Sequence, residues 1–240
     1  MRKAIAMIEL IFAIVIMGII LMSAPMLISQ ASKSGYVAIQ QEGINEAATQ
    51  VNLILGHYWD ENNVDETEDS IILQTGGNAG LNEDNSSGTL TGRRAGTPDT
   101  SFRTFLTSTG LRLTATGVGT DTGETLEEHN DDMDDFDAST SLAEIQSSPD
   151  ANYIETTTIN IARNVTYMAD APGGGSYLDP TADNKITFSD PFSAALPGGT
   201  TNIKQISVTL TSTSAADELE KQIVLRAFTC NIGSFRLEEQ

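Results

Sequence analysis

The sequence predicts an α+β fold in which one long N-terminal α-helix packs on an antiparallel β-sheet. Three observations predict it. Residues 5–28 form an apolar run that could cross the hydrocarbon core of a bilayer as a helix. Residues 29–59 carry an amphipathic helical pattern, and residues 151–240 alternate apolar and polar side chains as strands do. At 240 residues the chain is long enough to bury a core.

The apolar run is expected to be a single membrane span with its N-terminus in the cytoplasm. Arg2 and Lys3 precede it, and no basic residue follows until Lys33, which by the positive-inside rule places the rest of the chain on the exported side. The run is too long for the apolar region of a cleaved secretory signal. A plain single-pass anchor is therefore the simplest interpretation.

Glu9 does not fit a plain anchor, because it is the one charged residue within the apolar run. A carboxylate near the bilayer centre costs about 2.5 to 3.5 kcal/mol on insertion scales. The alternative interpretation is a carboxylate that is protonated, or that snorkels to one membrane face.

The stretch Ile5-Ala6-Met7-Ile8-Glu9-Leu10 resembles the class III signal of type IV pilins and pseudopilins. Gly18 and Pro25 lie at or next to positions where these families commonly carry glycine and proline. The resemblance implies a pilin-like fold with a long spine helix, membrane span and amphipathic half together, on an antiparallel sheet.

The same resemblance implies a leader at residues 1–4, which prepilin peptidase removes between Ala4 and Ile5 on the cytoplasmic side, followed by N-methylation of Ile5. The family usually has glycine before the cut, where this chain has Ala4. In these families the glutamate that matches Glu9 faces the free N-terminal amine of a neighbouring subunit, and pairing the two charges reduces the cost of burying either. The implied partners are other pilin or pseudopilin subunits, the peptidase and an inner-membrane assembly platform.

The helical pattern of residues 29–59 predicts an amphipathic continuation of the spine, and Gly35 and Gly43 are expected to be points of bending. Its apolar stripe repeats every seven residues, with further members between the repeats: Val37, Ile44, Ala47, Val51, Ile54, Leu55 and Tyr58.

Residues 60–150 are acidic and loop-rich, with short strands expected around Phe105 and Leu113. Residues 151–240 are expected to form the sheet. Within them, residues 202–230 are the clearest hairpin, with its turn at residues 214–217.

The segment from Glu124 to Asp137 holds eight acidic side chains in 14 residues and no Lys or Arg. Such a run usually marks a solvated loop. Calcium is the alternative, because clustered carboxylates supply the oxygens that this ion binds. Its candidate ligands are Asp131, Asp132, Asp134 and Asp135, although the spacing does not match an EF-hand loop.

A second resemblance lies in the same segment. Asp131-Asp132-Met133-Asp134-Asp135-Phe136 resembles an element of minor pilins of the mannose-sensitive haemagglutinin D type, in which a late hairpin strand like Ile203 to Leu210 also follows. Both resemblances imply a minor pilin or pseudopilin, first in the inner membrane and then in a periplasmic or surface filament. The alternatives are an uncleaved, membrane-anchored periplasmic binding protein and a pilus-tip adhesin that uses the loops of residues 60–150.

Charge and cysteine usage exclude several other functions. The formal net charge of −20 disfavours nucleic acid as a partner of the bulk domain. The one cysteine, Cys230, rules out an internal disulfide, and we expect it to be a buried strand residue. The chain has no phosphate loop, no G-x-S-x-G and no H-E-x-x-H, so we expect no enzyme.

Overall fold

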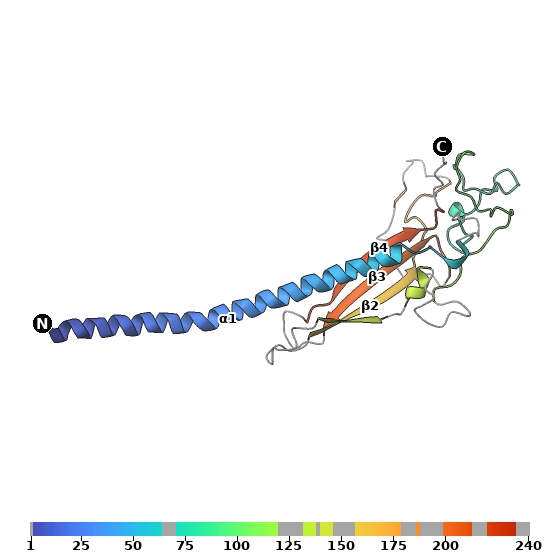
Figure 1. Cartoon of the computed structure of the whole chain (residues 1–240). Coiled ribbons are helices and arrows are strands. Elements are labelled where there is room, and N and C mark those ends of the chain that lie inside the picture. Colours follow the sequence, from blue (N-terminus) through green and yellow to red (C-terminus); the bar gives the residue numbers. More distant parts are fainter. Residues whose placement is uncertain are drawn as a thin grey trace, which may run out of the picture.

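The computed structural model describes residues 2–63, 71–119, 132–137, 140–145, 157–178, 186–187, 199–212 and 220–233. One helix, α1 (Arg2–Leu55), lies on a four-stranded antiparallel sheet (Figure 1). The strands are β1 (Thr140–Ile145), β2 (Thr157–Tyr167), β3 (Ile203–Ser212) and β4 (Ile223–Cys230), and they lie side by side in that order. The predicted α+β class is therefore confirmed.

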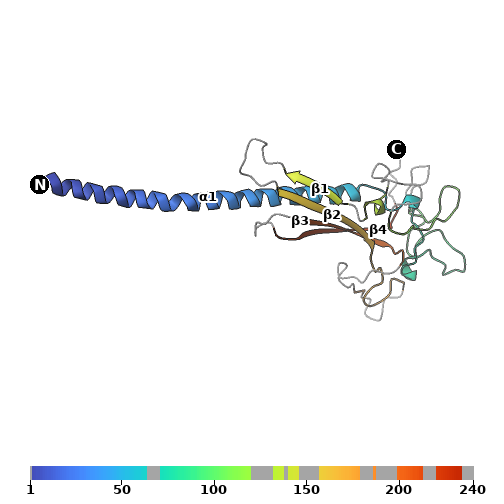
Figure 2. The ribbon, with the colours of Figure 1, turned by 90° about the horizontal axis from the view of Figure 1, so that it is seen from below.

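The N-terminal half of α1 extends far beyond the sheet, as both views of the ribbon show (Figures 1 and 2). Every residue from Met7 to Gly35 is exposed. This part of the helix is long and apolar enough to cross a membrane. Pro25 lies inside α1 without ending it, although proline removes one backbone donor from the helix.

The second half of α1 packs on the sheet, chiefly on β3 and β4. Ala47 and Ile54 are fully buried, while Ile44 and Val51 are half-buried. The other members of the predicted stripe, Val37, Leu55 and Tyr58, are exposed. Val37 lies before Gly43, the first buried residue of the helix. Leu55 is exposed although its neighbour Ile54 is fully buried, and Tyr58 lies beyond the end of the helix at Leu55.

Gly43 lies where the helix comes close to the sheet. It is buried, and a Cβ added there would lie 3.0 Å from Cδ1 of Ile159 on β2. A glycine allows this contact because it has no side chain. Gly35, in contrast, has nothing within 4 Å of the same position. The two glycines thus differ in role, and only Gly43 is a packing residue.

The inward-facing residues of β2 and β3 form the centre of the core. Ile161, Val165, Ile206 and Val208 are at most 1% exposed. The predicted hairpin is confirmed, because β3 pairs with β4 from Ile203 opposite Cys230 to Leu210 opposite Ile223. The turn predicted at residues 214–217 lies outside the described residues.

Cys230 is the last residue of β4 and is half-buried. This burial raises the pKa of its thiol.

Residues 71–119 lie at the end of the sheet away from the helix N-terminus (Figure 1). Within this stretch no regular strand forms, and the short strands predicted around Phe105 and Leu113 are replaced by isolated bridges such as Leu106 to Arg112. One of the two edge strands of the sheet is β1, which lies before the predicted sheet region of residues 151–240. Asn231 fastens the loops to the sheet, since its side chain accepts from the backbone N–H of Leu73 at 3.0 Å and donates to the Leu73 carbonyl at 2.7 Å.

Candidate functional site

The first candidate site is the free half of α1. Because α1 begins at Arg2, the bond between Ala4 and Ile5 lies within the first helical turns. Glu9 lies about one turn further on and is exposed. Among the residues whose side chains the structure describes, which begin at Met7, none forms a hydrogen bond or ion pair with the Glu9 side chain.

Apolar side chains surround Glu9 on all sides of the helix. Leu10, Ile11 and Phe12 are 57%, 59% and 64% exposed. The large apolar residues that follow, as far as Ile28, are also exposed. A surface helix of a globular protein has one apolar stripe, whereas a helix that is apolar all round belongs in a core or a bilayer. The free half of α1 therefore needs surroundings that this domain does not supply.

The second candidate site is the acidic segment, part of which lies inside the protein. Asp132, Asp134 and Asp135 are only 3%, 1% and 7% exposed, so the predicted solvated loop is wrong for residues 132–136. A short 3-10 helix, η4 (Asp134–Phe136), turns them inward. The Asp132 side chain begins this turn by accepting from the backbone N–H groups of Asp134 at 2.8 Å and Asp135 at 3.3 Å.

Lys204 on β3 explains why these carboxylates can be buried. Its side chain is fully buried, and Nζ donates to Oδ1 of Asp134 at 2.5 Å and to the Trp59 carbonyl at 2.5 Å. Oδ2 of Asp60 is 3.5 Å from the same nitrogen. A buried charge is costly unless it is paired and hydrogen-bonded, and Lys204 meets both conditions. We call Lys204, Asp134, Asp60, Trp59 and Tyr167 the lysine cluster.

Aromatic rings and a tyrosine hydroxyl complete the lysine cluster. Nζ of Lys204 lies 4.4 Å from the centre of the Trp59 ring and 5.1 Å from that of Tyr167. The Tyr167 hydroxyl donates to the Thr116 carbonyl at 2.8 Å and lies 3.4 Å from Oδ2 of Asp60. The same oxygen accepts from the backbone N–H of Thr116 at 2.9 Å. The cluster thus connects the residues that follow α1, the loop that contains Thr116, η4 and the strands β2 and β3.

Burial raises the pKa of three groups here, Asp134, Asp132 and Tyr167. Loss of solvation raises the pKa of Asp134 to about 8, although the ammonium of Lys204 opposes the shift. Burial also raises the pKa of Asp132, and it raises that of the Tyr167 hydroxyl, with Asp60 as a further cause. The neutral form of Asp134 is therefore accessible near neutral pH.

The structure gives the calcium alternative no site among the residues it describes. Within those residues, no group of three or more acidic, histidine or cysteine side chains is arranged to hold a metal ion. Asp131, the remaining candidate ligand, lies outside the described residues. The oxygens of Asp134 and Asp132 are engaged by Lys204 and by backbone N–H groups.

Sequence reasoning singled out the acidic segment but missed Lys204 and Asp60. The signal for Lys204 was present, because in an alternating strand it shares a face with Ile206, Val208 and Leu210. A lysine on the core side of a strand needs a buried acid. No pattern in the sequence marked Asp60 as that partner.

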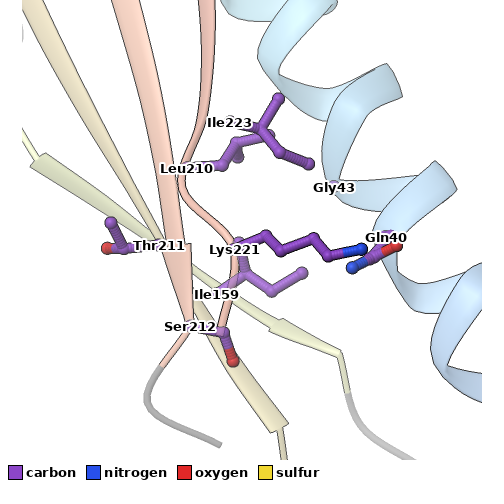
Figure 3. A pocket seen from close by; sticks show the side chains of 8 residues that line it. All are labelled: Gln40, Gly43, Ile159, Leu210, Thr211, Ser212, Lys221 and Ile223. Atoms are coloured by element: carbon purple, nitrogen blue, oxygen red, sulfur yellow. The ribbon is translucent and has the colours of Figure 1, made fainter. Parts of the chain in front are cut away.

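A small groove lies between α1 and the ends of β2, β3 and β4 (Figure 3). Lys221 is the one ionisable side chain in its lining. The lining residues are Gln40, Gly43, Ile159, Leu210, Thr211, Ser212, Lys221 and Ile223.

Comparison of the chain with protein-family models, with curated proteins and with solved structures finds no match. The features that bear on function are therefore the free half of α1, the lysine cluster and the residues of the N-terminal stretch.

Proposed function

We propose that this chain is a structural subunit, a minor pilin or pseudopilin, of a type IV pilus or type II secretion filament, and that it assembles through its N-terminal helix. The observation that carries the proposal is the free half of α1. It is exposed and apolar all round, holds a single carboxylate at Glu9, and continues without a break into the helix that packs on the sheet.

The free half of α1 can be placed in two environments, a bilayer or a bundle of similar helices. In a bilayer the apolar surface of α1 is satisfied, but Glu9 is costly. In a bundle of such helices the apolar surface is satisfied by neighbours. After cleavage before Ile5, the free amine of a neighbouring subunit supplies a counter-charge for Glu9, so the carboxylate favours assembly over the membrane.

The lysine cluster gives secondary support. The two segments that carry the second resemblance, residues 131–136 and 203–210, lie far apart in the sequence, yet Asp134 and Lys204 join them through a buried ion pair. Two motifs that contact each other in the structure support a shared architecture with minor pilins more strongly than two short matches that lie apart.

The proposal specifies a route through the cell. The chain is inserted as a single-pass inner-membrane precursor with a cytoplasmic N-terminus, cut by prepilin peptidase between Ala4 and Ile5, and N-methylated at Ile5. It then leaves the bilayer at the assembly platform and joins other subunits in a periplasmic or surface filament. The net charge of −20 of the chain disfavours nucleic acid as a partner.

One observation favours an added adhesive role at a filament tip. The loops of residues 71–119 lie at the end of the domain opposite the free helix (Figure 1) and expose large apolar side chains, with Phe102 at 48% and Leu111 at 61%. A contiguous exposed apolar patch would suit a binding partner, and these side chains are the candidates for one. This role adds to assembly and does not replace it.

The test replaces residues 1–28 by an uncleaved apolar span of equal length without a carboxylate. Wild type and this chimera are compared in inner-membrane and sheared-filament fractions, or in a cross-linked pseudopilus. A filament subunit predicts that the chimera stays in the membrane and is absent from the filaments. If the wild type is itself absent from filaments in cells that assemble them, the proposal fails in favour of the plain anchor.

A further inference from the structure

Lys204 and Asp134 are positioned to react with each other. Their side chains are 0% and 2% exposed, and the amine nitrogen lies 2.5 Å from a carboxyl oxygen bonded to the carbon it would attack. We propose that these two side chains condense into an intramolecular isopeptide bond, with the release of one water molecule. This inference is independent of the proposed filament function.

The first requirement of such a reaction is a neutral amine facing a neutral carboxylic acid. Moving one proton along the hydrogen bond from Lys204 to Asp134 produces both groups at once. A buried ion pair is penalised by loss of solvation, so the interior favours the neutral pair far more than water does. The raised pKa of Asp134, about 8, has the same cause.

The second requirement is a group that moves the amine proton, and Asp60 is placed for this role. Its Oδ2 lies 3.5 Å from Nζ of Lys204, and its side chain is fully buried. As Nζ attacks Cγ of Asp134, Asp60 takes one proton from the nitrogen. It then returns that proton to the departing hydroxyl, which leaves as water. A carbon–nitrogen bond replaces a carbon–oxygen bond, and no oxidant or other reactant is needed.

The third requirement is orientation without water. The Trp59 carbonyl accepts a hydrogen bond from Nζ at 2.5 Å, which fixes the direction of the amine. The rings of Trp59 and Tyr167 cover the nitrogen at 4.4 Å and 5.1 Å. Holding two reactants in contact raises their effective concentration by many orders of magnitude, and a dry site protects the amide from hydrolysis.

The bond has a structural consequence. It joins η4 to β3 across 70 positions of the sequence, as a disulfide would join two cysteines. With Cys230 as its one cysteine, the chain cannot form an internal disulfide. The Lys204 to Asp134 bond would be its covalent brace.

The test is peptide mass mapping of the full-length wild-type protein, purified after folding and then denatured. A trypsin digest should contain residues 113–163 joined to residues 186–221, with Lys204 uncut and the mass lower than the sum of the two peptides by one water. Unlinked peptides cut after Lys204 would overturn the proposal. A link from Lys204 to Asp60 in place of Asp134 would overturn the assignment.

Variants separate the roles within the cluster. Asp134→Ala and Lys204→Arg should lack the linked product, and Lys221→Arg, which changes an exposed lysine, should keep it. In Asp134→Asn the reaction should release ammonia in place of water and give the same amide. Asp60→Asn should leave the peptides unlinked, and a linked product in that variant would overturn the role of Asp60. Because the wild-type digest alone decides whether the bond exists, failure of a variant to fold does not remove the test.

Discussion

Glu9 is the residue on which assembly depends in this account, and its replacement separates two processes. Glu9→Val removes a costly carboxylate from an apolar helix, so membrane insertion should stay intact or improve. Assembly should fail, because the neighbour's amine would be buried without its partner, and breaking one side of a buried pair costs about 3 to 5 kcal/mol. The measurement is the amount of the variant in membrane and filament fractions.

Two control variants belong to this experiment. Glu42→Val removes an exposed carboxylate from the same helix outside the apolar run and should assemble normally. Glu9→Asp keeps the charge and should assemble in part. Entry of Glu9→Val into filaments at the wild-type level would contradict an assembly role for Glu9.

Glu83 is a residue-scale test of how the acidic loops are held. Its buried carboxylate accepts from Arg112 Nε at 2.6 Å and Nη2 at 2.8 Å, and from the backbone N–H of Gly92. The hydrogen bonds from Arg112 lower the pKa of Glu83 below its usual value of 4.5. Its stabilising contribution is therefore present above pH 4.5 and lost as pH falls below that value.

Glu83→Gln should lower the free energy of unfolding at neutral pH by about 1 to 2 kcal/mol, because Arg112 and Gly92 lose a charged partner. It should also remove part of the acid-induced loss of stability that the wild type shows. Denaturant titrations from pH 7 to pH 3 measure both effects. Glu220→Gln, at an exposed site, is the control, and equal behaviour of the two variants would contradict a structural role for Glu83.

At the scale of elements, the helix and the hairpin could be predicted because their signals are local. An apolar run, a helical period and the alternation of Ile206, Val208 and Leu210 are all visible in short windows of sequence. β1 could not be predicted in this way, since an edge strand is specified by the neighbour it pairs with. Which members of the helical stripe are buried depends on the packing of the helix on the sheet, which the helix sequence does not contain.

The same difference between local and tertiary signals applies to the candidate sites. Glu9 could be singled out because a lone charge in an apolar run is conspicuous. The burial of Asp134 could not, since an acidic run usually marks a solvated surface and the compensating charge comes from a distant strand. A buried pair of this kind is a property of the tertiary structure.

Gly43 tests the packing of the helix on the sheet. Gly43→Leu should lower the free energy of unfolding by about 1 to 3 kcal/mol, because the new side chain would collide with Ile159 and overpack the interface. Gly35→Leu is the matched control in open space and should be neutral or stabilising, since leucine is the better helix former. Denaturation of the full chain in detergent measures both, and a neutral Gly43→Leu would show that α1 does not lie this close to the sheet.

The whole molecule combines a folded, acidic domain with a helix that the domain leaves uncovered. Half of α1 is anchored by the core, whereas every residue from Met7 to Gly35 is exposed. A membrane satisfies that half in a plain anchor, and a membrane followed by neighbouring helices satisfies it in a filament subunit. The fate of residues 1–4 separates these two accounts, since only the filament subunit requires a free amine at Ile5.

The most direct test is therefore the mass of the N-terminal tryptic peptide of the protein, recovered from cells that process other prepilins. A filament subunit should yield a peptide that starts at Ile5, ends at Lys33 and carries a methylated amine. This peptide includes no residue of the lysine cluster, so its mass is independent of any bond between Lys204 and Asp134. A chain that still contains residues 1–4 in those cells would contradict the filament function.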